Sequence, residues 1–403
     1  MVYLDHAATT PLRPEAEEAW LRATQELRVV PGNPAALHSG ARNARRLLED
    51  ARESIAHNLG ADRAEVIFTS GATEANALGI VGSWRGMRQH GYSAVQVCAA
   101  DHPSSWNQQT VIEREGGIFK TLEVDTNGVA VVESLSPDAG VISFSLVCSE
   151  TGTLQPLAKI VDRVNENYDE QKYSRKPLVH IDVCQALHTL PVNLHADGID
   201  LITLSAHKIG GPVGIGALAI KRGTPLRTDR PGGDQELKYR SGTVDVAGAC
   251  AFAAALNAAT VERDELRKRC ETLQKRLWDG IKILQNRGEL PAEVTQTVTA
   301  EIAPTIAHLS IPTAHPEAVL LNLDRAGIWA SAGSACHAGV TRPSRVIMEM
   351  GRNETQALGV LRLSFGPGST EADIDSFLTA LPSTLQQAQA LDKLDQRSKK
   401  KRN

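Results

Sequence analysis

The residues best suited to chemistry are the run Ser205-Ala206-His207-Lys208, which follows the apolar segment 199–204 and precedes the glycine-rich segment 209–214. A lysine amine can form a Schiff base with the aldehyde of a cofactor, while a nearby hydroxyl and imidazole can hold a phosphate. Glycines let the backbone approach a ligand closely. Because a lysine after a strand is more often a solvated charge, this interpretation needs support from elsewhere in the chain.

A carboxylate upstream provides part of that support. The run Val179-His180-Ile181-Asp182 predicts a short strand ending in an acid, and Gln185 follows one helical turn later. Ligands of α/β proteins bind at the carboxyl ends of strands. Asp182 there can keep a pyridine nitrogen protonated, and Gln185 can donate to a phenolic oxygen. The alternative is that Asp182 caps a helix, but Lys208 on the next predicted strand favours the cofactor.

A third element is the segment 68–76, which predicts a strand end, a turn of small residues and a helix running to about Trp84. Free backbone amides and the helix dipole make such a turn an anion site, to which Ala72 and Thr73 contribute. Many such turns bind nothing when they occur alone. Together with Lys208 and Asp182, the turn predicts a site for pyridoxal 5'-phosphate (PLP), with Ser205 and His207 near the phosphate.

The chain resembles the cysteine desulfurases, which are class V, fold-type-I PLP enzymes, and is similar to their nitrogen-fixation and iron–sulfur-assembly type over nearly its whole length. The motifs that carry the resemblance are Tyr3-Leu4-Asp5-His6-Ala7-Ala8-Thr9-Thr10-Pro11, Gly32-Asn33-Pro34, His38-Ser39, Gly71-Ala72-Thr73-Glu74-Ala75-Asn76, Asp101-His102-Pro103, Asp182 with Gln185, Ser205-Ala206-His207-Lys208, Arg240-Ser241-Gly242-Thr243, Gly333-Ser334-Ala335-Cys336 and Arg362-Leu363-Ser364-Phe365-Gly366. The family usually has Asn at the position of His6. It commonly has Asn-Asn where this chain has Cys148-Ser149, so an amide expected near the cofactor is missing.

The pattern of elements agrees with the fold that the resemblance implies. Short apolar runs alternate with helical stretches, which predicts a parallel-rich α/β sheet with helices on both faces. These runs are 66–69, 95–99, 141–144, 179–182, 199–204 and 215–220. We expect a large PLP-binding domain on a mostly parallel seven-stranded sheet over 16–262, and a smaller α+β domain from 1–15 and 263–392. A long amphipathic helix near 261–284 leaves the large domain, and the basic tail 393–403 is expected to be disordered.

Cys336 is the residue that separates a desulfurase from other members of the superfamily. It lies among small residues, which indicates an exposed loop, and its Gly-Ser-Ala-Cys context is similar to that of the long-loop desulfurases. The alternative is a small buried apolar residue, the usual place of a free cysteine. The resemblance implies that Cys336 is the nucleophile that accepts sulfur.

Further roles follow from the resemblance. His102 would stack on the PLP ring and move protons, and the fork of Arg362 would hold the substrate carboxylate, with Asn33 also on the substrate side. Without the resemblance, Arg362 reads as a surface salt bridge and His102 as structural. The loop ending in Thr243 resembles one that reaches the phosphate of a partner subunit, so a homodimer is expected.

The function implied is an L-cysteine desulfurase, which converts L-cysteine to L-alanine and leaves a persulfide on Cys336 for a protein acceptor. Alternatives are another class V reaction, such as selenocysteine cleavage or aminotransfer, and a weakly active regulatory or scaffold homologue with the altered Cys148-Ser149 segment. The acceptor is open: an iron–sulfur scaffold, a tRNA-thiolation enzyme, a DNA-sulfur-modification system or another carrier.

Composition agrees with a cytoplasmic enzyme. The 403 residues are 42% hydrophobic and 22% charged, with a net charge of −4, so direct binding to nucleic acid or membranes is not expected. No run approaches the ~18 apolar residues of a membrane span, and the first residues lack a signal pattern. The six cysteines are scattered without a Cys-x-x-Cys pair, which predicts neither a metal site nor a disulfide framework.

Overall fold

The computed structural model describes residues 1–333 and 342–402, with side chains as far as residue 394. A seven-stranded sheet, here called the large sheet, has the order β2-β8-β7-β6-β5-β3-β4. Its strands are β2 (Val66–Thr69), β3 (Ala94–Cys98), β4 (Ile118–Leu122), β5 (Ala139–Ser145), β6 (Leu178–Asp182), β7 (Leu201–Ser205) and β8 (Gly216–Ile220). The five strands from β4 to β7 are parallel, whereas β8 is antiparallel to both of its neighbours. The predicted mostly parallel seven-stranded sheet is confirmed.

The inner strands of the large sheet are mostly apolar because both faces are covered. Ile67 packs on one face with Trp84, while its neighbour Phe68 packs on the other with Ile55. Two-sided burial produces continuous apolar runs, which is why these strands were predictable. The edge strand β4 was missed, because most of its side chains are partly or fully exposed and it pairs only with β3.

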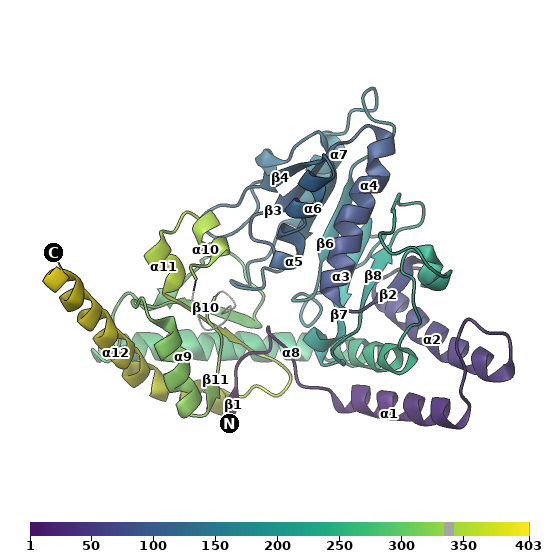
Figure 1. Ribbon diagram of the computed structural model, residues 1–403. Helices are drawn as coiled ribbons and strands as arrows, with labels where there is room; N and C mark the ends of the chain where they lie inside the picture. The colour runs from purple at the N-terminus through teal and green to yellow at the C-terminus, as the bar shows by residue number, and fades with distance from the viewer. Residues whose placement is uncertain (334–341, 403) are drawn as a thin grey trace.

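Helices cover the two faces unequally (Figure 1). One face lies under α2 (Ser39–Asn58), α7 (Leu157–Glu166) and the first part of α8 (Val246–Asn286), and α1 (Pro14–Val29) packs on α8. The other face lies under α3 (Ala72–Ala77), which continues through one π-helical turn (Leu78–Gly82) into α4 (Ser83–Met87). The short helices α5 (Pro103–Trp106) and α6 (Gln109–Arg114) follow β3.

A second, antiparallel sheet has the order β12-β10-β9. Its strands are β9 (Thr295–Gln296), β10 (Ile306–Ser310) and β12 (Val360–Ser364), and the pair β1 (Val2–Tyr3) and β11 (Ile328–Trp329) lies beside it. The helices around it are α9 (Pro316–Arg325), α10 (Arg345–Glu349), α11 (Glu354–Leu358) and α12 (Glu371–Arg402). Both ends of the chain therefore belong to this smaller part.

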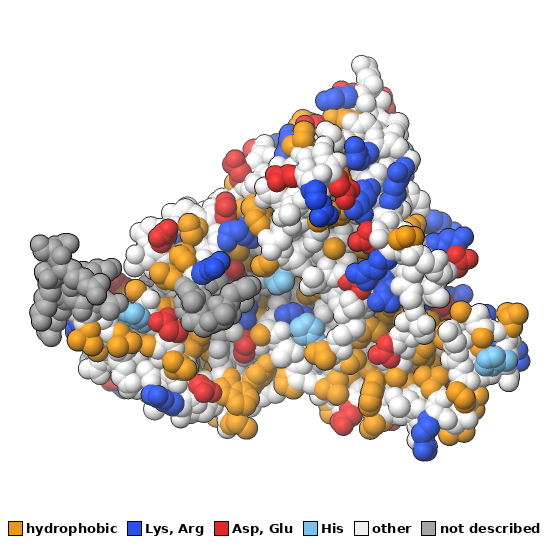
Figure 2. Space-filling model, in the orientation of Figure 1, with side chains coloured by type: hydrophobic (Ala, Val, Ile, Leu, Met, Phe, Trp, Pro, Cys, Tyr) orange, Lys and Arg blue, Asp and Glu red, His pale blue; other side chains and the backbone are white. Residues whose placement is uncertain are grey.

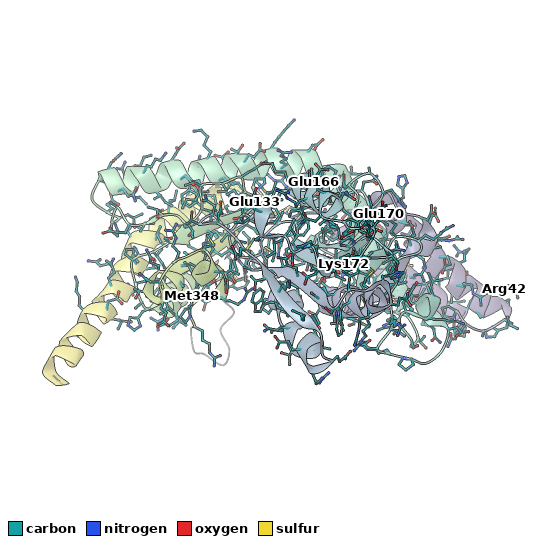
Figure 3. All side chains as sticks on the ribbon, turned by 90° about the horizontal axis from the view of Figure 1, so that it is seen from above. Arg42, Glu133, Glu166, Glu170, Lys172 and Met348 are labelled. Atoms are coloured by element: carbon teal, nitrogen blue, oxygen red, sulfur yellow. The ribbon has the colours of Figure 1, made fainter. Side chains whose placement is uncertain are left out.

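The long helix α8 joins the two parts and lies along one edge of the molecule (Figure 3). Its buried apolar side chains up to Ala259 belong to the core under the large sheet, and those from Leu266 to Ile281 belong to the core of the small sheet. This change of core supports the proposed domain boundary near residue 262. No helix within residues 1–333 and 342–402 is long and apolar enough to cross a membrane.

The end of the chain differs from the expectation. Helix α12 continues to Arg402, through the segment 393–402 for which a disordered tail was predicted. The segment after Pro382 contains no further glycine or proline before Arg402 and is rich in Ala, Leu, Gln, Lys and Arg. These residues have high helix propensity, so the charge run alone was a poor guide.

Trp106, which follows the Asp101-His102-Pro103 motif, contacts a residue of the smaller part of the molecule. The Arg345 guanidinium carbon lies 4.1 Å from the centroid of the Trp106 ring, and the ring meets Phe119 edge-on at 5.4 Å. Arg345 also donates hydrogen bonds to the carbonyls of Ala99 and Asp101. Because Arg345 opens α10 of the smaller part, this contact ties that part to the carboxyl end of β3.

We expect the cation–π contact to show as coupling in a double-mutant cycle. Trp106→Leu and Arg345→Met, made singly and together, should give a coupling of about 1 kcal/mol in the free energy of unfolding, the size of a partly desolvated cation–π pair. Urea unfolding followed by fluorescence measures it. Trp20→Leu, on the exposed side of α1, is the control and should be additive with Arg345→Met. Additive effects at Trp106 would show that the contact contributes no energy.

Candidate active site

A cavity of about 390 Å³ opens at the carboxyl ends of β5, β6 and β7. Eight of the residues predicted from the sequence line it: Ala72, Thr73, His102, Asp182, Gln185, Ser205, His207 and Lys208. Parallel strands end at the same edge of a sheet, so motifs far apart in the chain meet there. Asn33 and Thr243 do not line this cavity. They lie together in a separate groove of about 560 Å³ beside Arg52 and Glu236.

Lys208 is placed by the turn after β7. The strand ends at Ser205, a 3-10 turn covers Ala206–Ile209, and Gly210 follows with a φ of 81°. The Lys208 amine donates to the carbonyls of Ala7 at 2.6 Å and Ala8 at 2.9 Å. Burial lowers the pKa of Lys208, and the nearby Arg362 acts in the same direction. A lowered pKa leaves more of the amine neutral, which is the nucleophilic form.

Asp182 ends β6, and the residue is 7% exposed. One oxygen, Oδ1, accepts a hydrogen bond from the Cys184 backbone at 2.9 Å, and Oδ2 accepts one from Asn76 Nδ2 at 2.8 Å. Both oxygens of the carboxylate therefore have a hydrogen-bond donor. The carboxylate organises the turn that follows and also faces the cavity, so the two interpretations of Asp182 are compatible.

The small-residue turn between β2 and α3 is held by Glu74. This side chain accepts from the Ser70 backbone at 2.6 Å and forms ion pairs with Arg230 at 2.6 Å and Arg240 at 3.0 Å. Burial raises the pKa of Glu74, but these hydrogen bonds outweigh burial and hold it below its ordinary value. Arg240 therefore anchors the 240–243 motif next to the turn.

The histidines at the cavity are neutral near pH 7. Burial lowers the pKa of His207 to about 4, with the Lys208 charge adding to the effect, and His207 Nδ1 lies 3.1 Å from Thr9 Oγ1. Burial also lowers the pKa of His102. Neutral imidazoles can donate from one nitrogen and accept at the other.

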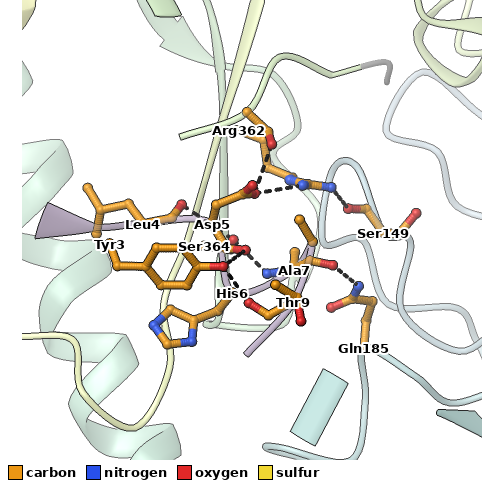
Figure 4. Close-up of polar contacts among 12 residues, drawn as sticks. Tyr3, Leu4, Asp5, His6, Ala7, Thr9, Ser149, Gln185, Arg362 and Ser364 are labelled. Atoms are coloured by element: carbon orange, nitrogen blue, oxygen red, sulfur yellow. Dashed lines mark hydrogen bonds and ion pairs between the residues drawn. The ribbon is translucent and has the colours of Figure 1, made fainter. Parts of the chain in front are cut away.

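Arg362 lies beside the cavity on β12 and is only 9% exposed, so it is not a surface salt bridge. Its Nη2 donates to Asp5 Oδ1 at 3.0 Å and its Nη1 to the Ser149 carbonyl at 2.9 Å (Figure 4). Its Nε is buried and has no hydrogen-bond partner among the described residues. Such a guanidinium retains donor capacity for a carboxylate. Sequence reasoning missed Asp5, because nothing local marks a pair so distant in the chain.

The segment after β1 contacts several cavity residues at once. The Ala7 carbonyl accepts from Gln185 Nε2 at 2.9 Å, and the Ala7 backbone donates to Ser364 Oγ at 2.8 Å (Figure 4). The same carbonyl also accepts from the Lys208 amine. Thr10 Oγ1 donates to the Lys208 carbonyl at 2.8 Å. Gln185 was expected to donate to a cofactor oxygen, and here its amide binds the backbone.

Cys148 does not replace the amide that the family commonly has. Its thiol is 1% exposed and donates to the Ala100 carbonyl at 3.5 Å, away from the cavity. Ser149 does line the cavity, and its carbonyl binds Arg362. The site therefore has one polar side chain fewer than the usual motif would give it.

Cys336, the predicted nucleophile, lies outside the described residues. The other five cysteines are free thiols, four of them buried. Burial raises the pKa of every one, to about 11 for Cys250 and about 12 for Cys270. A thiol with a raised pKa is a weak nucleophile at neutral pH, so none of these five is prepared for attack.

Comparisons with known proteins agree with this geometry. The model of the family described as aminotransferase class-V matches residues 2–377. An IscS-like cysteine desulfurase of Mycobacterium tuberculosis is 35% identical over 402 residues, covering 96% of this chain and 97% of that protein. The solved structure of a NifS-like protein is 27% identical with a TM-score of 0.84, covering 96% of this chain and 99% of that one. A structure of SspA in complex with cysteine is 25% identical with a TM-score of 0.73, covering 92% and 100%.

The match spans nearly the whole chain in sequence and in structure, and the motifs named above lie within the matched residues. The chain therefore belongs to the aminotransferase class-V family, which depends on PLP, and within it to the NifS- and IscS-like cysteine desulfurases.

Proposed function

We propose that the chain moves sulfur from L-cysteine to Cys336, releases L-alanine and passes the sulfur to a protein acceptor. The observation that carries the proposal is that one cavity contains the Lys208 amine and the Asp182 carboxylate. The relative solved with cysteine supports the choice of substrate.

The residues at the cavity fit PLP. When bound, PLP supplies an electron sink that stabilises negative charge at the substrate α-carbon. Lys208 would bind its carbonyl carbon and Asp182 its pyridine nitrogen. The Ala72 amide, Thr73, Ser205 and His207 would hold the phosphate, Gln185 would donate to the phenolic oxygen, and His102 would stack on the ring.

The substrate would be held by the Arg362 guanidinium and deprotonated by the neutral amine of Lys208. The Arg362 guanidinium would bind the α-carboxylate, as the resemblance implies. Asn33, which the resemblance also assigns to the substrate side, lies in the separate groove and is not part of this cavity. Lys208, with its lowered pKa, would take the α-proton and later return one. A group whose pKa lies closer to the working pH is the better base in such a step.

Cys336 would perform the sulfur transfer. Its thiolate attacks the sulfur of L-cysteine, so that a sulfur–sulfur bond forms while the carbon–sulfur bond breaks, and the carbon product takes up a proton to become alanine. No external oxidant is needed, because the electron pair of the broken carbon–sulfur bond stays with the carbon, which is reduced while the two sulfurs are oxidised to the persulfide. The persulfide then moves to the acceptor.

The chain would act as a cytoplasmic homodimer. Figure 2 shows hydrophobic side chains along the lower part of this face, where Figure 1 places α1. On α1, the hydrophobic side chains of Trp20, Leu21 and Val29 are 42%, 54% and 67% exposed. Such a patch favours an interface, and the groove containing Asn33 and Thr243 would then lie where a partner subunit can reach it. The free thiols of the five described cysteines favour a reducing compartment.

Asp182→Asn tests the carboxylate. The amide keeps the shape but loses the charge, and a hydrogen bond to a charged group contributes about 1.5–3 kcal/mol, so kcat should fall by about 10- to 100-fold. PLP affinity should fall less. Alanine formation and PLP titration measure the two effects. Asp200→Asn is the matched control, because Asp200 accepts a hydrogen bond from Val179 outside the cavity. Wild-type kinetics for Asp182→Asn would show that the Asp182 carboxylate only stabilises the turn after β6 and has no role in catalysis.

Cys336→Ser tests the sulfur transfer. The hydroxyl is not ionised near neutral pH, so alanine production should fall by more than about 100-fold, while PLP still binds. Mass spectrometry after brief exposure to L-cysteine should find one extra sulfur on the Cys336 peptide of the wild type alone. Cys250→Ser should behave as wild type. An extra sulfur on Cys148 or Cys184 instead, or undiminished alanine release from Cys336→Ser, would contradict the mechanism.

A further inference from the structure

A chain of hydrogen-bonded side chains connects Asp182 to His102. Asn76 Nδ2 lies 2.8 Å from Asp182 Oδ2 and 2.9 Å from Ser104 Oγ, and Ser104 Oγ lies 2.8 Å from His102 Nδ1. Asn76 is fully buried on α3, and Ser104 is 8% exposed on α5. The chain therefore runs from Asp182 through two buried side chains to His102, which lies in the segment after β3 and is itself exposed at the cavity.

The chemistry of these groups gives the chain a direction. An ionised carboxylate only accepts hydrogen bonds, and both oxygens of Asp182 have N–H donors. The Asn76 amide must therefore present its nitrogen to Asp182, because the opposite orientation would place two oxygens 2.8 Å apart. The second N–H of the same nitrogen donates to Ser104 Oγ. The Ser104 hydroxyl hydrogen is then left to point at His102 Nδ1.

The ring of His102 receives a second donor at the same atom. The Ser104 backbone N–H lies 3.1 Å from His102 Nδ1, so Nδ1 faces two donors and acts as an acceptor. In a neutral imidazole the proton then resides on Nε2. His102 lines the cavity, and Nε2 is the ring nitrogen not engaged by Ser104.

The charges around His102 agree with a neutral ring. Burial lowers its pKa most, Lys208, Arg362 and Arg345 act in the same direction, and Asp182 acts in the opposite one. Protonation would add a hydrogen to Nδ1 facing the Ser104 N–H, which the geometry disfavours. The ring is therefore expected to stay neutral at pH 7–8.

We propose that Asn76 and Ser104 are positioning residues that fix His102 as the Nε2–H tautomer, so that His102 presents a hydrogen-bond donor to the cavity and not a base. The inference rests on the proposed function for its role in turnover. It assigns the removal of the α-proton to Lys208, because an Nε2 that already bears hydrogen cannot accept another. It also assigns to Ser104 and Asn76 a positioning role that no local sequence pattern predicted.

The tautomer can be measured directly by ¹⁵N NMR of the full chain loaded with PLP and labelled at histidine. The His102 signals are assigned by their loss in His102→Gln. In the wild type at pH 8, Nδ1 should have the shift of an unprotonated nitrogen and Nε2 that of a protonated one. This first result requires no variant at Asn76 or Ser104, so it tests the proposal whether or not such variants fold.

Substitutions then test the chain itself. A neutral hydrogen bond contributes about 1 kcal/mol, so Ser104→Ala should lower the ratio of the Nε2–H to the Nδ1–H tautomer about fivefold. Asn76→Ala should also lower this ratio. Ser104→Thr keeps the hydroxyl and should restore the wild-type ratio. Ser105→Ala is the matched control, since Ser105 is the neighbouring residue, is also buried, and has an Oγ with no hydrogen-bond partner among the described residues.

An Nδ1–H tautomer in the wild type, or the same ratio in Ser104→Ala as in Ser105→Ala, would overturn the proposal. The tautomer is measured without substrate, so it can fail while Cys336 still accepts sulfur. Conversely, loss of the desulfurase assignment at Cys336 would leave the tautomer result intact. The two failures are thus distinguishable.

Discussion

The need to stabilise buried charges at one edge of the large sheet determines how the rest of the structure is arranged. Asp182 and Arg362 lie almost out of water, and a buried charge is tolerated only where hydrogen bonds replace its hydration. Asp182 therefore has an amide and a backbone N–H, and Arg362 has Asp5 and a carbonyl. Lys208 has two carbonyls of its own. These partners come from residues 5–8, from α3, from the turn after β6 and from the segment that contains Ser149, so the charges together hold the cavity wall in place.

The segment between β1 and α1 links those charges across the two parts of the molecule. Through β1 it pairs with β11 of the smaller part, and a few residues later its carbonyls bind the Lys208 amine of the larger part. Thr10 contacts the backbone of the same lysine turn. Arg345, on Trp106, fixes the two parts at a second point. A shift between the two parts would therefore move the lysine relative to Arg362, which supports treating both parts as one catalytic unit.

The sequence predicted what local patterns encode. Strands buried on both faces are continuous apolar runs, and the residues at their carboxyl ends, such as Asp182 and Lys208, had to meet at one edge. It could not predict partners joined only by the fold. Asp5 meets Arg362 across nearly the whole chain, and Ser104 reaches His102 through a turn whose geometry is not written in residue types. The edge strand β4 was not predicted because its side chains are partly exposed. The final turns of α12 were not predicted because the run of charged residues was taken as a sign of disorder, although these residues favour helix.

The claim on which the account depends is that Lys208 is the lysine that carries the cofactor. Borohydride reduction of the protein loaded with PLP makes the bond between cofactor carbon and amine permanent, and peptide mass spectrometry then locates it. The account predicts one reduced PLP per chain, on the peptide that contains Lys208, and none on this peptide when Lys208 is replaced by alanine. A label on Lys221 or another lysine, or no label at all in a protein that still produces alanine from cysteine, would contradict it.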